Sequence, residues 1–338
     1  MKKNMNISDI LKVIKSILIS CKKVRKNTIK YFFIKYNFYF IMIFMILLST
    51  IFSKGTFIKL SNLSNLLLQS SIVGILAMGQ FLVILTGGIE LSVGSILAAC
   101  SMLGALFISQ GYGIALSVLL SIALGFGLGF LNGIFISKGK IPPFIATLGM
   151  MGIARSLARQ INYNCPIWAI PEEFLLFGKG YLGPIPIPLL IWLNIFFLIF
   201  LLVNRTHYGR YIYAVGTNEN AARLSGVNVD KIKLLVYILA GMICGIGAIV
   251  SIGRVGYAFP DAGMSYNLDS ITGVVIGGTS LSGGKGTATG VLVGVIIVGI
   301  ISNFMNIIGI NLFLQQILKG VILLTAVYIN CIVSKKVN

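Results

Sequence analysis

Ten apolar segments constrain the fold of this chain more than any other feature of its sequence. They cover residues 36–53, 63–85, 91–110, 113–137, 141–160, 185–203, 234–252, 269–283, 286–307 and 312–332. A helix needs about 20 mainly apolar residues to cross the roughly 30 Å hydrocarbon layer of a bilayer. The longer segments meet this length, so the sequence predicts an all-α, polytopic integral membrane protein with about ten transmembrane helices.

Composition and charge support this class of protein. Of the 338 residues, 57% are hydrophobic and 10% are charged, whereas charged residues make up about a quarter of a soluble domain. The net charge of +19 is unevenly placed: ten of the 27 Lys and Arg residues precede Tyr36, and five lie within 205–233. By the positive-inside rule this pattern indicates cytoplasmic segments that contact anionic membrane lipid, and it requires no nucleic acid partner.

The basic clusters divide the chain into three parts. Residues 1–35 form a basic cytoplasmic arm, in which the apolar positions of 7–21 repeat as in an amphipathic helix lying on the membrane surface. Residues 36–332 form the transmembrane domain, and residues 333–338 a cytoplasmic tail. No small-x-small cleavage site follows the first apolar segment, so we expect an uncleaved helix there and not a signal peptide.

The positive-inside rule also gives a membrane topology. With the N-terminus inside, six crossings return residues 204–233 to the cytoplasm, and ten crossings return the C-terminus there. Residues 162–184 then form the largest external segment. The segment 269–283 is short and rich in glycine, so a re-entrant loop is the alternative to a regular crossing at that point.

The loop 204–233 is the longest polar passage after the arm, and it contains the signature of a short helix. Asn218 is a good N-cap residue, and Glu219 falls in the first turn, where the helix dipole favours a negative charge. Gly226 suits the left-handed conformation that ends many helices. The sequence therefore predicts a short helix over 218–226, held off the membrane between two sets of spans.

This predicted helix resembles the Glu-Ala-Ala-type coupling loop of ABC importer permeases, in Glu219, Ala221, Ala222 and Gly226. Other passages resemble the ribose-type sugar permeases, and together the likeness covers most of residues 60–332. These passages are residues 86–95, 132–149, 277–286 and 315–320. The resemblance implies a transport subunit, not an enzyme, that carries a ribose-like monosaccharide across the bacterial cytoplasmic membrane.

The resemblance also implies partners and residue roles. An ABC ATPase subunit would hydrolyse ATP with Mg, an extracytoplasmic sugar-binding protein would deliver the sugar, and a second copy of the chain would complete a homodimer. The chain itself would bind no cofactor. The residues implied in ATPase coupling are Asn218, Glu219, Ala221, Ala222, Arg223 and Gly226. Among them, Arg223 is expected to pair with an acidic group on the ATPase.

Two segments share the pattern Gly-Gly-x-x-Leu-Ser-x-Gly, residues 87–94 and 277–284. Such an internal repeat suggests a duplicated fold whose halves are related by a pseudo-two-fold axis. The alternative is chance repetition in a glycine-rich chain. Glycine pairs break helices, and hydrocarbon tolerates the freed backbone groups only where protein or water surrounds them. Both segments are therefore predicted to lie at the substrate pathway.

Glycines also repeat every four residues in two predicted helices, at Gly125, Gly129 and Gly133 and at Gly286, Gly290 and Gly294. A third and shorter instance is the pair Gly241 and Gly245. Each series clears one helix face of side chains, so that a neighbouring backbone can approach closely. We expect these glycines to serve packing and to bind no ligand.

Polar residues at membrane depth are costly, and so they are candidates for a function. The candidates for the substrate pathway and gate are Gln69, Gln80, Gly87, Gly88, Glu90, Ser92, Asn132, Thr147, Gly277, Gly278, Ser282, Gly283, Asn303, Asn306, Gln315 and Lys319. Amide side chains both donate and accept hydrogen bonds, which suits a neutral polyhydroxyl solute. The alternative for each residue is a bond to a neighbouring helix. Lys319 is expected to pair with Glu90 or to extend to the nearer interface.

Nucleotide and metal sites are not predicted for this chain. The sequence has no Gly-x-x-x-x-Gly-Lys-Ser/Thr phosphate loop, so the nucleotide site is expected on another subunit. Its five cysteines show no Cys-x-x-Cys spacing, which leaves no basis for a zinc site or a disulfide framework.

Other functions remain open on the sequence. An ion-coupled secondary transporter would need acidic groups in the bilayer, for which the chain offers Glu90 and Asp269. An intramembrane enzyme is less favoured, because the only histidine, His207, lies in the cytoplasmic loop and no His-Glu-x-x-His motif occurs. An ABC permease for a nucleoside or another small polar solute is a further alternative.

Overall fold

The computed structural model describes residues 37–337 and is almost entirely helical, with one short hairpin. The elements are α2 (Asn37–Phe52), η1 (Thr56–Ile58), α3 (Leu60–Leu85), α4 (Val93–Ser109), α5 (Ile114–Ser137), α6 (Pro143–Ile161), α7 (Glu172–Lys179), β1 (Tyr181–Leu182), β2 (Ile185–Pro186), α8 (Ile187–Arg205), α9 (His207–Thr217), α10 (Glu219–Leu224), α11 (Val229–Val255), α12 (Tyr266–Ile276), α13 (Ala288–Ile307) and α14 (Leu312–Val337). The predicted basic arm, residues 1–35 with its amphipathic stretch 7–21, lies outside the described residues. The all-α class is confirmed.

A helix lies within or across each of the ten predicted segments. Within the described part, five helices are long and apolar enough to cross a membrane by length and composition: α3, α5, α8, α11 and α13. The predicted segment 269–283 is wrong in its extent, because α12 ends at Ile276 and the chain continues as an irregular loop. The total of ten crossings therefore stays a prediction.

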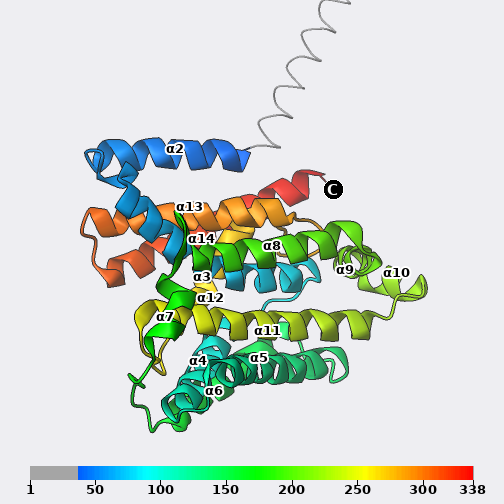
Figure 1. Ribbon diagram of the computed structural model, residues 1–338. Coiled ribbons are helices and arrows are strands. Elements are labelled where there is room, and N and C mark those ends of the chain that lie inside the picture. Colours follow the sequence, from blue (N-terminus) through cyan, green and yellow to red (C-terminus); the bar gives the residue numbers. More distant parts are fainter. Residues whose placement is uncertain (1–36, 338) are drawn as a thin grey trace, which may run out of the picture.

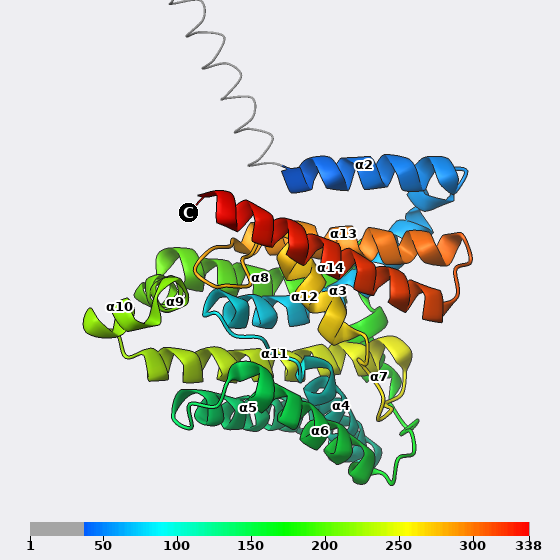
Figure 2. The same cartoon turned by 180° about the vertical axis from the view of Figure 1, so that it is seen from behind.

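The long helices run side by side, and the bundle has two distinct ends (Figures 1 and 2). One end carries α9, α10 and the C-terminal end of α14. The opposite end carries α7 and the two-residue strands β1 and β2, which pair antiparallel. The polar loop 204–233 and the predicted external segment 162–184 therefore lie at opposite ends, as the sequence analysis expects.

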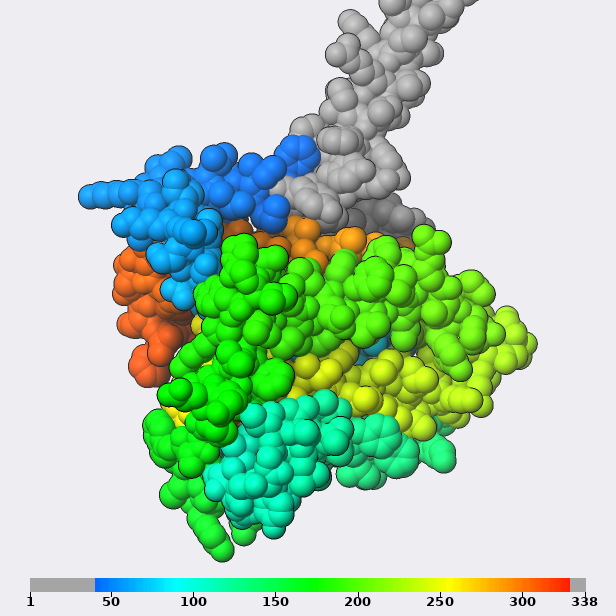
Figure 3. Space-filling model, in the orientation of Figure 1, coloured from blue at the N-terminus to red at the C-terminus, as the bar shows by residue number. Residues whose placement is uncertain are grey.

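Two central helices, α3 and α11, hold the bundle together, and both are largely buried. On one side α8 covers α3, and its Trp192 ring lies against Gly74. The space-filling view shows α8 at the surface on this side (Figure 3). On the other side α11 packs between α3 and α5. Because the middle of α3 is surrounded by protein, its polar residues face other helices and not lipid.

The glycine series explain how closely the helices approach. A Cβ added at Gly129 would collide with the Tyr237 carbonyl oxygen, and one added at Gly125 would collide with the carbonyl oxygen of Gly241. The series in α13 acts similarly, since Gly294 abuts the Gly273 carbonyl oxygen. The predicted packing role is confirmed for these residues, with one exception: Gly286 precedes the first residue of α13 and does not belong to the helical series.

Replacing Gly129 by Val should destabilise the bundle by separating α5 from α11. Overpacking of this kind costs about 1–3 kcal/mol. The matched control is Gly127→Val on the same helix, because nothing lies within 4 Å of a Cβ added there. Thermal unfolding in detergent should show a lowered Tm for Gly129→Val only, and equal Tm values for the two variants would contradict this account of the contact.

Candidate functional site

The two segments with the shared glycine pattern interrupt the helical bundle. Residues 86–92, the first glycine loop, separate α3 from α4, and residues 277–287, the second glycine loop, separate α12 from α13. Gly87, Gly278 and Gly283 have φ values of 78°, 84° and 82°, a region open to glycine at little cost. The predicted helix breaks are confirmed.

The two glycine loops lie against each other. The amide nitrogen of Gly284 donates to the carbonyl oxygen of Leu85, at the end of α3, over 3.0 Å. A Cβ added at Gly283 would lie 2.8 Å from the amide nitrogen of Gly87. The backbone group freed at the end of α3 thus finds its partner in the second loop, as burial in a membrane requires. A pseudo-two-fold relation between the loops stays a prediction.

The first glycine loop is held by buried side chains from three helices. Gln80 of α3 faces the main chain of Glu90, its amide nitrogen 3.0 Å from the carbonyl oxygen and its amide oxygen 3.3 Å from the amide nitrogen. Asn132 of α5 donates to the Glu90 carboxylate over 2.8 Å, and the Ser92 amide nitrogen donates to the same carboxylate over 2.8 Å. Thr147 of α6 donates to the Ile89 carbonyl oxygen over 3.2 Å.

This cluster changes the interpretation of five predicted pathway residues. Gln80, Glu90, Ser92, Asn132 and Thr147 are each at most 2% exposed, and each binds the first glycine loop or is part of it. The Ser92 hydroxyl also donates to Glu90. In this conformation these residues fix the loop, which is the alternative role that the sequence left open. A direct contact with a solute stays a prediction.

A second polar group lies near the opposite end of the bundle. Asn303 of α13 and Asn62 of α3 exchange two hydrogen bonds of 2.9 Å. Gln315 of α14 donates to Asn306 over 2.8 Å. Gln69, also on α3, is partly exposed and belongs to neither hydrogen-bonded group. Asn62 is not among the predicted candidates, because the predicted apolar segment begins at residue 63.

Lys319 has a different partner from the one expected. Its ammonium group lies 2.9 Å from the Asp269 carboxylate, and the side chains of Lys319 and Asp269 are 17% and 7% exposed. The expected pairing with Glu90 is wrong, because Glu90 is already bound in the first glycine loop. With 11 residues α12 is about 16 Å long, too short to cross a bilayer. The ion pair therefore fastens this half-helix to α14.

The polar loop contains two helices where the sequence analysis predicted one. Asn218 caps α10 as predicted, its side-chain oxygen accepting from the Ala221 amide nitrogen over 3.0 Å. Gly226 has a φ of 84°, also as predicted, although the helix itself ends at Leu224. The helix α9 was missed. Its signals were an N-cap at Thr206 and the spacing of its two buried apolar residues, Ile212 and Val215.

The helix α9 links the polar loop to the end of α3 and to the second glycine loop. A Cβ added at Gly216 would collide with the Leu85 carbonyl oxygen, and Gly284 lies against Thr217. The Tyr213 hydroxyl donates to the Gly286 carbonyl oxygen over 2.7 Å. The helix α9 therefore contacts the end of α3 and the second glycine loop directly, and it cannot be displaced without changing these contacts.

Ion pairs fasten α10 to the rest of the bundle. The Glu219 carboxylate lies 2.6 Å from the Lys233 ammonium group of α11, and Arg223 lies 2.9 Å from Asp230. Asp230 in turn lies 2.6 Å from Lys140, in the loop between α5 and α6. Arg223, expected to pair with an ATPase, thus pairs within the chain. Exposed pairs of this kind contribute at most about 1 kcal/mol each.

The hydrogen bond from Lys233 lowers the pKa of Glu219, and the nearby charge of Arg223 acts in the same direction. The carboxylate therefore stays ionised throughout the neutral range. Its stabilising contribution is present above the ordinary pKa and is lost as the pH falls through the lowered value.

The side chains of α10 divide between the bundle and the solvent. Ala222 is 5% exposed and packs inward, so it seats α10 on its own bundle and is not available to a partner. Ala221 is exposed, and so is Leu224, whose exposed fraction of 91% is the largest among the described large hydrophobic residues. Sequence reasoning missed Leu224, although a leucine beside Arg223 in a polar loop was a signal.

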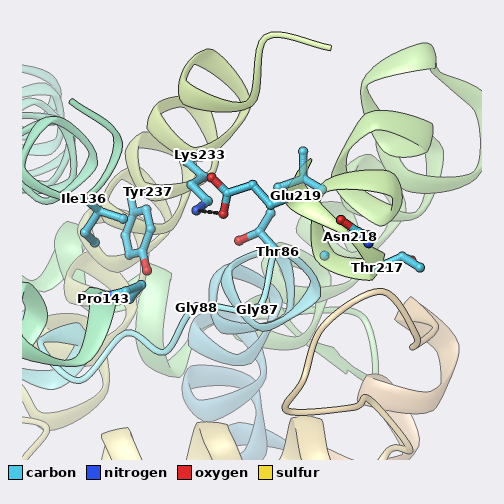
Figure 4. A pocket seen from close by; sticks show the side chains of 12 residues that line it. Thr86, Gly87, Gly88, Ile136, Pro143, Thr217, Asn218, Glu219, Lys233 and Tyr237 are labelled. Carbon is cyan, nitrogen blue, oxygen red and sulfur yellow. Dashed lines mark hydrogen bonds and ion pairs between the residues drawn. The ribbon is translucent and has the colours of Figure 1, made fainter. Parts of the chain in front are cut away.

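A pocket of about 340 Å³ lies where these parts meet (Figure 4). One wall is the first glycine loop, at Gly87 and Gly88. The facing wall comes from α9 and α10, and the pair of Glu219 and Lys233 closes one side. The structure thus brings predicted gate residues and predicted coupling residues to one pocket.

A family model described as "Branched-chain amino acid transport system / permease component" matches residues 62–327. The chain belongs to this family. It is therefore a multi-pass membrane permease, a transport subunit and not an enzyme. Because it is one component of a transport system, it works with others, including the subunit that supplies energy and the protein that binds the solute.

Several curated relatives cover nearly the whole permease. The ribose import permease protein of Bacillus subtilis (strain 168) is 40% identical over 86% of this chain and 91% of its own length. The D-allose transport system permease protein of Escherichia coli (strain K12) is 33% identical over 90% and 94%. The fructose import permease protein of Rhizobium meliloti is 37% identical over 82% and 79%. No solved structure matches the chain.

The buried ion pair of α12 gives a test of its structural role. Replacing Asp269 by Ala leaves the Lys319 charge buried without its partner, and we expect the free energy of unfolding to fall by about 3–5 kcal/mol. Replacing both residues by Ala should restore much of this loss. Thermal unfolding of the two single variants and the double variant measures the coupling, and strictly additive effects would show that the pair is not an energetic contact.

Proposed function

We propose that this permease is the membrane-spanning subunit of an ABC importer that carries a ribose-like monosaccharide into the cytoplasm. Its similarity to a ribose import permease, 40% identity over most of both chains, carries this proposal. The polar residues of the bundle agree with a neutral cargo, because amides and hydroxyls predominate and the buried charges are already engaged. Glu90 is bound by Ser92 and Asn132, and Asp269 is bound by Lys319.

The surface for the ATPase subunit is proposed to be α9 and α10. Leu224 lies at the end of this element and is 91% exposed, so a partner that covers it would gain the burial of a large apolar side chain. Ala221 lies on the accessible face, while Ala222 and the ion pair of Glu219 keep α10 seated on its own bundle. Force on Leu224 would then reach the glycine loops through Gly216. ATP and Mg belong to the ATPase, and the permease binds no cofactor.

The proposed orientation places α10 and both termini in the cytoplasm. Lys138 and Lys140 lie in the loop that faces the same end of the bundle as α10, in agreement with the positive-inside rule. The opposite end is then extracytoplasmic. There the bridge between Ile167 and Ala258 and the stacking of Trp168 on Tyr257, with 4.1 Å between ring centroids, form an ordered surface.

We propose this opposite end as the surface for the extracytoplasmic sugar-binding protein. A second copy of the permease would complete the translocation path between two bundles. Both partners are implied by the kinship with sugar import permeases, and the exposed apolar face of α5 and α6 offers surface for the second copy and for lipid.

The proposed function predicts ATP-driven uptake of a monosaccharide by the complete complex. Proteoliposomes that contain the permease and its ATPase, supplied with the binding protein, should accumulate labelled D-ribose only when ATP is enclosed. A proton uncoupler should leave this uptake intact. Uptake that needs no ATP and stops with the uncoupler would favour a secondary transporter, and uptake of a nucleoside in place of sugars would correct the cargo.

Replacing Leu224 by Ser should weaken the binding of the ATPase subunit by about tenfold or more, since burying a leucine side chain contributes roughly 1.5–3 kcal/mol. Leu182→Ser is the matched control, because Leu182 is 69% exposed at the opposite end of the bundle. Co-purification of the ATPase with each variant measures the effect. Equal recovery with both variants would remove Leu224 from the interface.

A further inference from the structure

The pocket between the first glycine loop and α9–α10 is lined by polar groups whose hydrogen-bonding capacity is only partly used. The ammonium group of Lys233 has three N–H donors, and the described contacts use one of them, toward Glu219. Asn218 uses its side-chain oxygen to cap α10, which leaves its amide nitrogen free of the cap. The Glu219 carboxylate can accept more hydrogen bonds than it receives. One side of the pocket therefore offers both hydrogen-bond donors and acceptors.

A buried hydroxyl group stands at the inner part of the same pocket. Tyr237 is 1% exposed, and its hydroxyl oxygen lies beside Gly88 and Pro143, both of which line the pocket (Figure 4). It has no hydrogen-bond partner among the described residues. A buried hydroxyl group without a partner is costly, and a ligand in the pocket would supply one.

The charges and the size of the pocket select the ligand. Among the lining residues Lys233 is the sole cation and Glu219 the sole anion, and they lie 2.6 Å apart, so the pocket is close to neutral. A phosphate group would meet the Glu219 carboxylate and only one cation. Ile136 and Val215 supply an apolar wall. A volume of about 340 Å³ is at the small end for ligand pockets, and these features suit a neutral monosaccharide.

The geometry points to a sugar site separate from the translocation path between the two copies, one in each permease, that binds a monosaccharide from the cytoplasmic side. This inference rests on the proposed function, because it takes the same class of solute. A sugar held there binds the first glycine loop, α9 and α10 in their present arrangement, and thereby stabilises this conformation relative to the others of the transport cycle. Accumulated sugar should therefore slow further import.

Protection from chemical labelling tests occupancy of the pocket. Thr217 lines the pocket and is exposed, so a Thr217→Cys variant, made with Cys21, Cys165 and Cys331 replaced by Ser, gives a reactive thiol at its mouth. D-ribose, D-allose, D-fructose and D-galactose are each added to the purified permease before a maleimide, with sucrose as a control of larger size. We expect a monosaccharide, and not sucrose, to slow labelling of position 217 several-fold relative to the same variant without sugar.

Removing the Tyr237 hydroxyl group tests the same site without labelling at position 217. Tyr237→Phe should lower the affinity for the protecting monosaccharide about five- to tenfold, measured by equilibrium binding. The matched control is Tyr112→Phe, at the opposite end of the bundle, and gel filtration verifies that both variants stay folded.

The outcomes separate this inference from the proposed function. If no monosaccharide is imported by the complete complex, the proposed function fails. If one is imported, yet it neither protects position 217 nor slows import when enclosed in the vesicles, the pocket is no sugar site. Equal affinities of the Tyr237→Phe and Tyr112→Phe variants would also overturn the inference.

Discussion

The need to satisfy backbone groups inside a membrane governs this structure. Two helices stop within the bundle, at Leu85 and Ile276, and hydrocarbon cannot hydrogen-bond the carbonyl groups that a helix end leaves free. The structure solves this by placing the two glycine loops together, so that Gly284 donates to Leu85. Gly216 of α9 lies in the same contact, where any side chain would collide. The interrupted helices and α9 are thus parts of one junction.

Buried polar and charged side chains bind the parts of this junction to the surrounding helices. Glu90 is held by Ser92 and Asn132, and Asp269 by Lys319. Each group would be costly alone at membrane depth, and each is instead paired. Because the pairs connect loops to long helices, they define one position for each loop. Transport then requires that the junction move as a body or that these pairs change partners.

Sequence patterns predicted the local features of the fold well and the long-range contacts poorly. The N-cap at Asn218 and the left-handed Gly226 depend on neighbouring residues only, and both are confirmed. The partner of Lys319 was wrong, because spacing along the chain does not tell which buried acid lies near it. The sequence also did not predict that Ala222 packs against the bundle, because the six residues of α10 are too few to show a helical period.

The central claim is that α9 and the second glycine loop move together. Thr217 and Ser282 lie on these two parts and are both exposed, so cysteines at both positions can be joined by a short bifunctional maleimide in a cysteine-free background. The account predicts that the cross-linked permease, assembled with its ATPase, keeps ATP-driven sugar uptake near the rate of the unlinked protein. Loss of uptake on cross-linking, with ATP hydrolysis continuing, would show that the two parts must separate and would contradict the account.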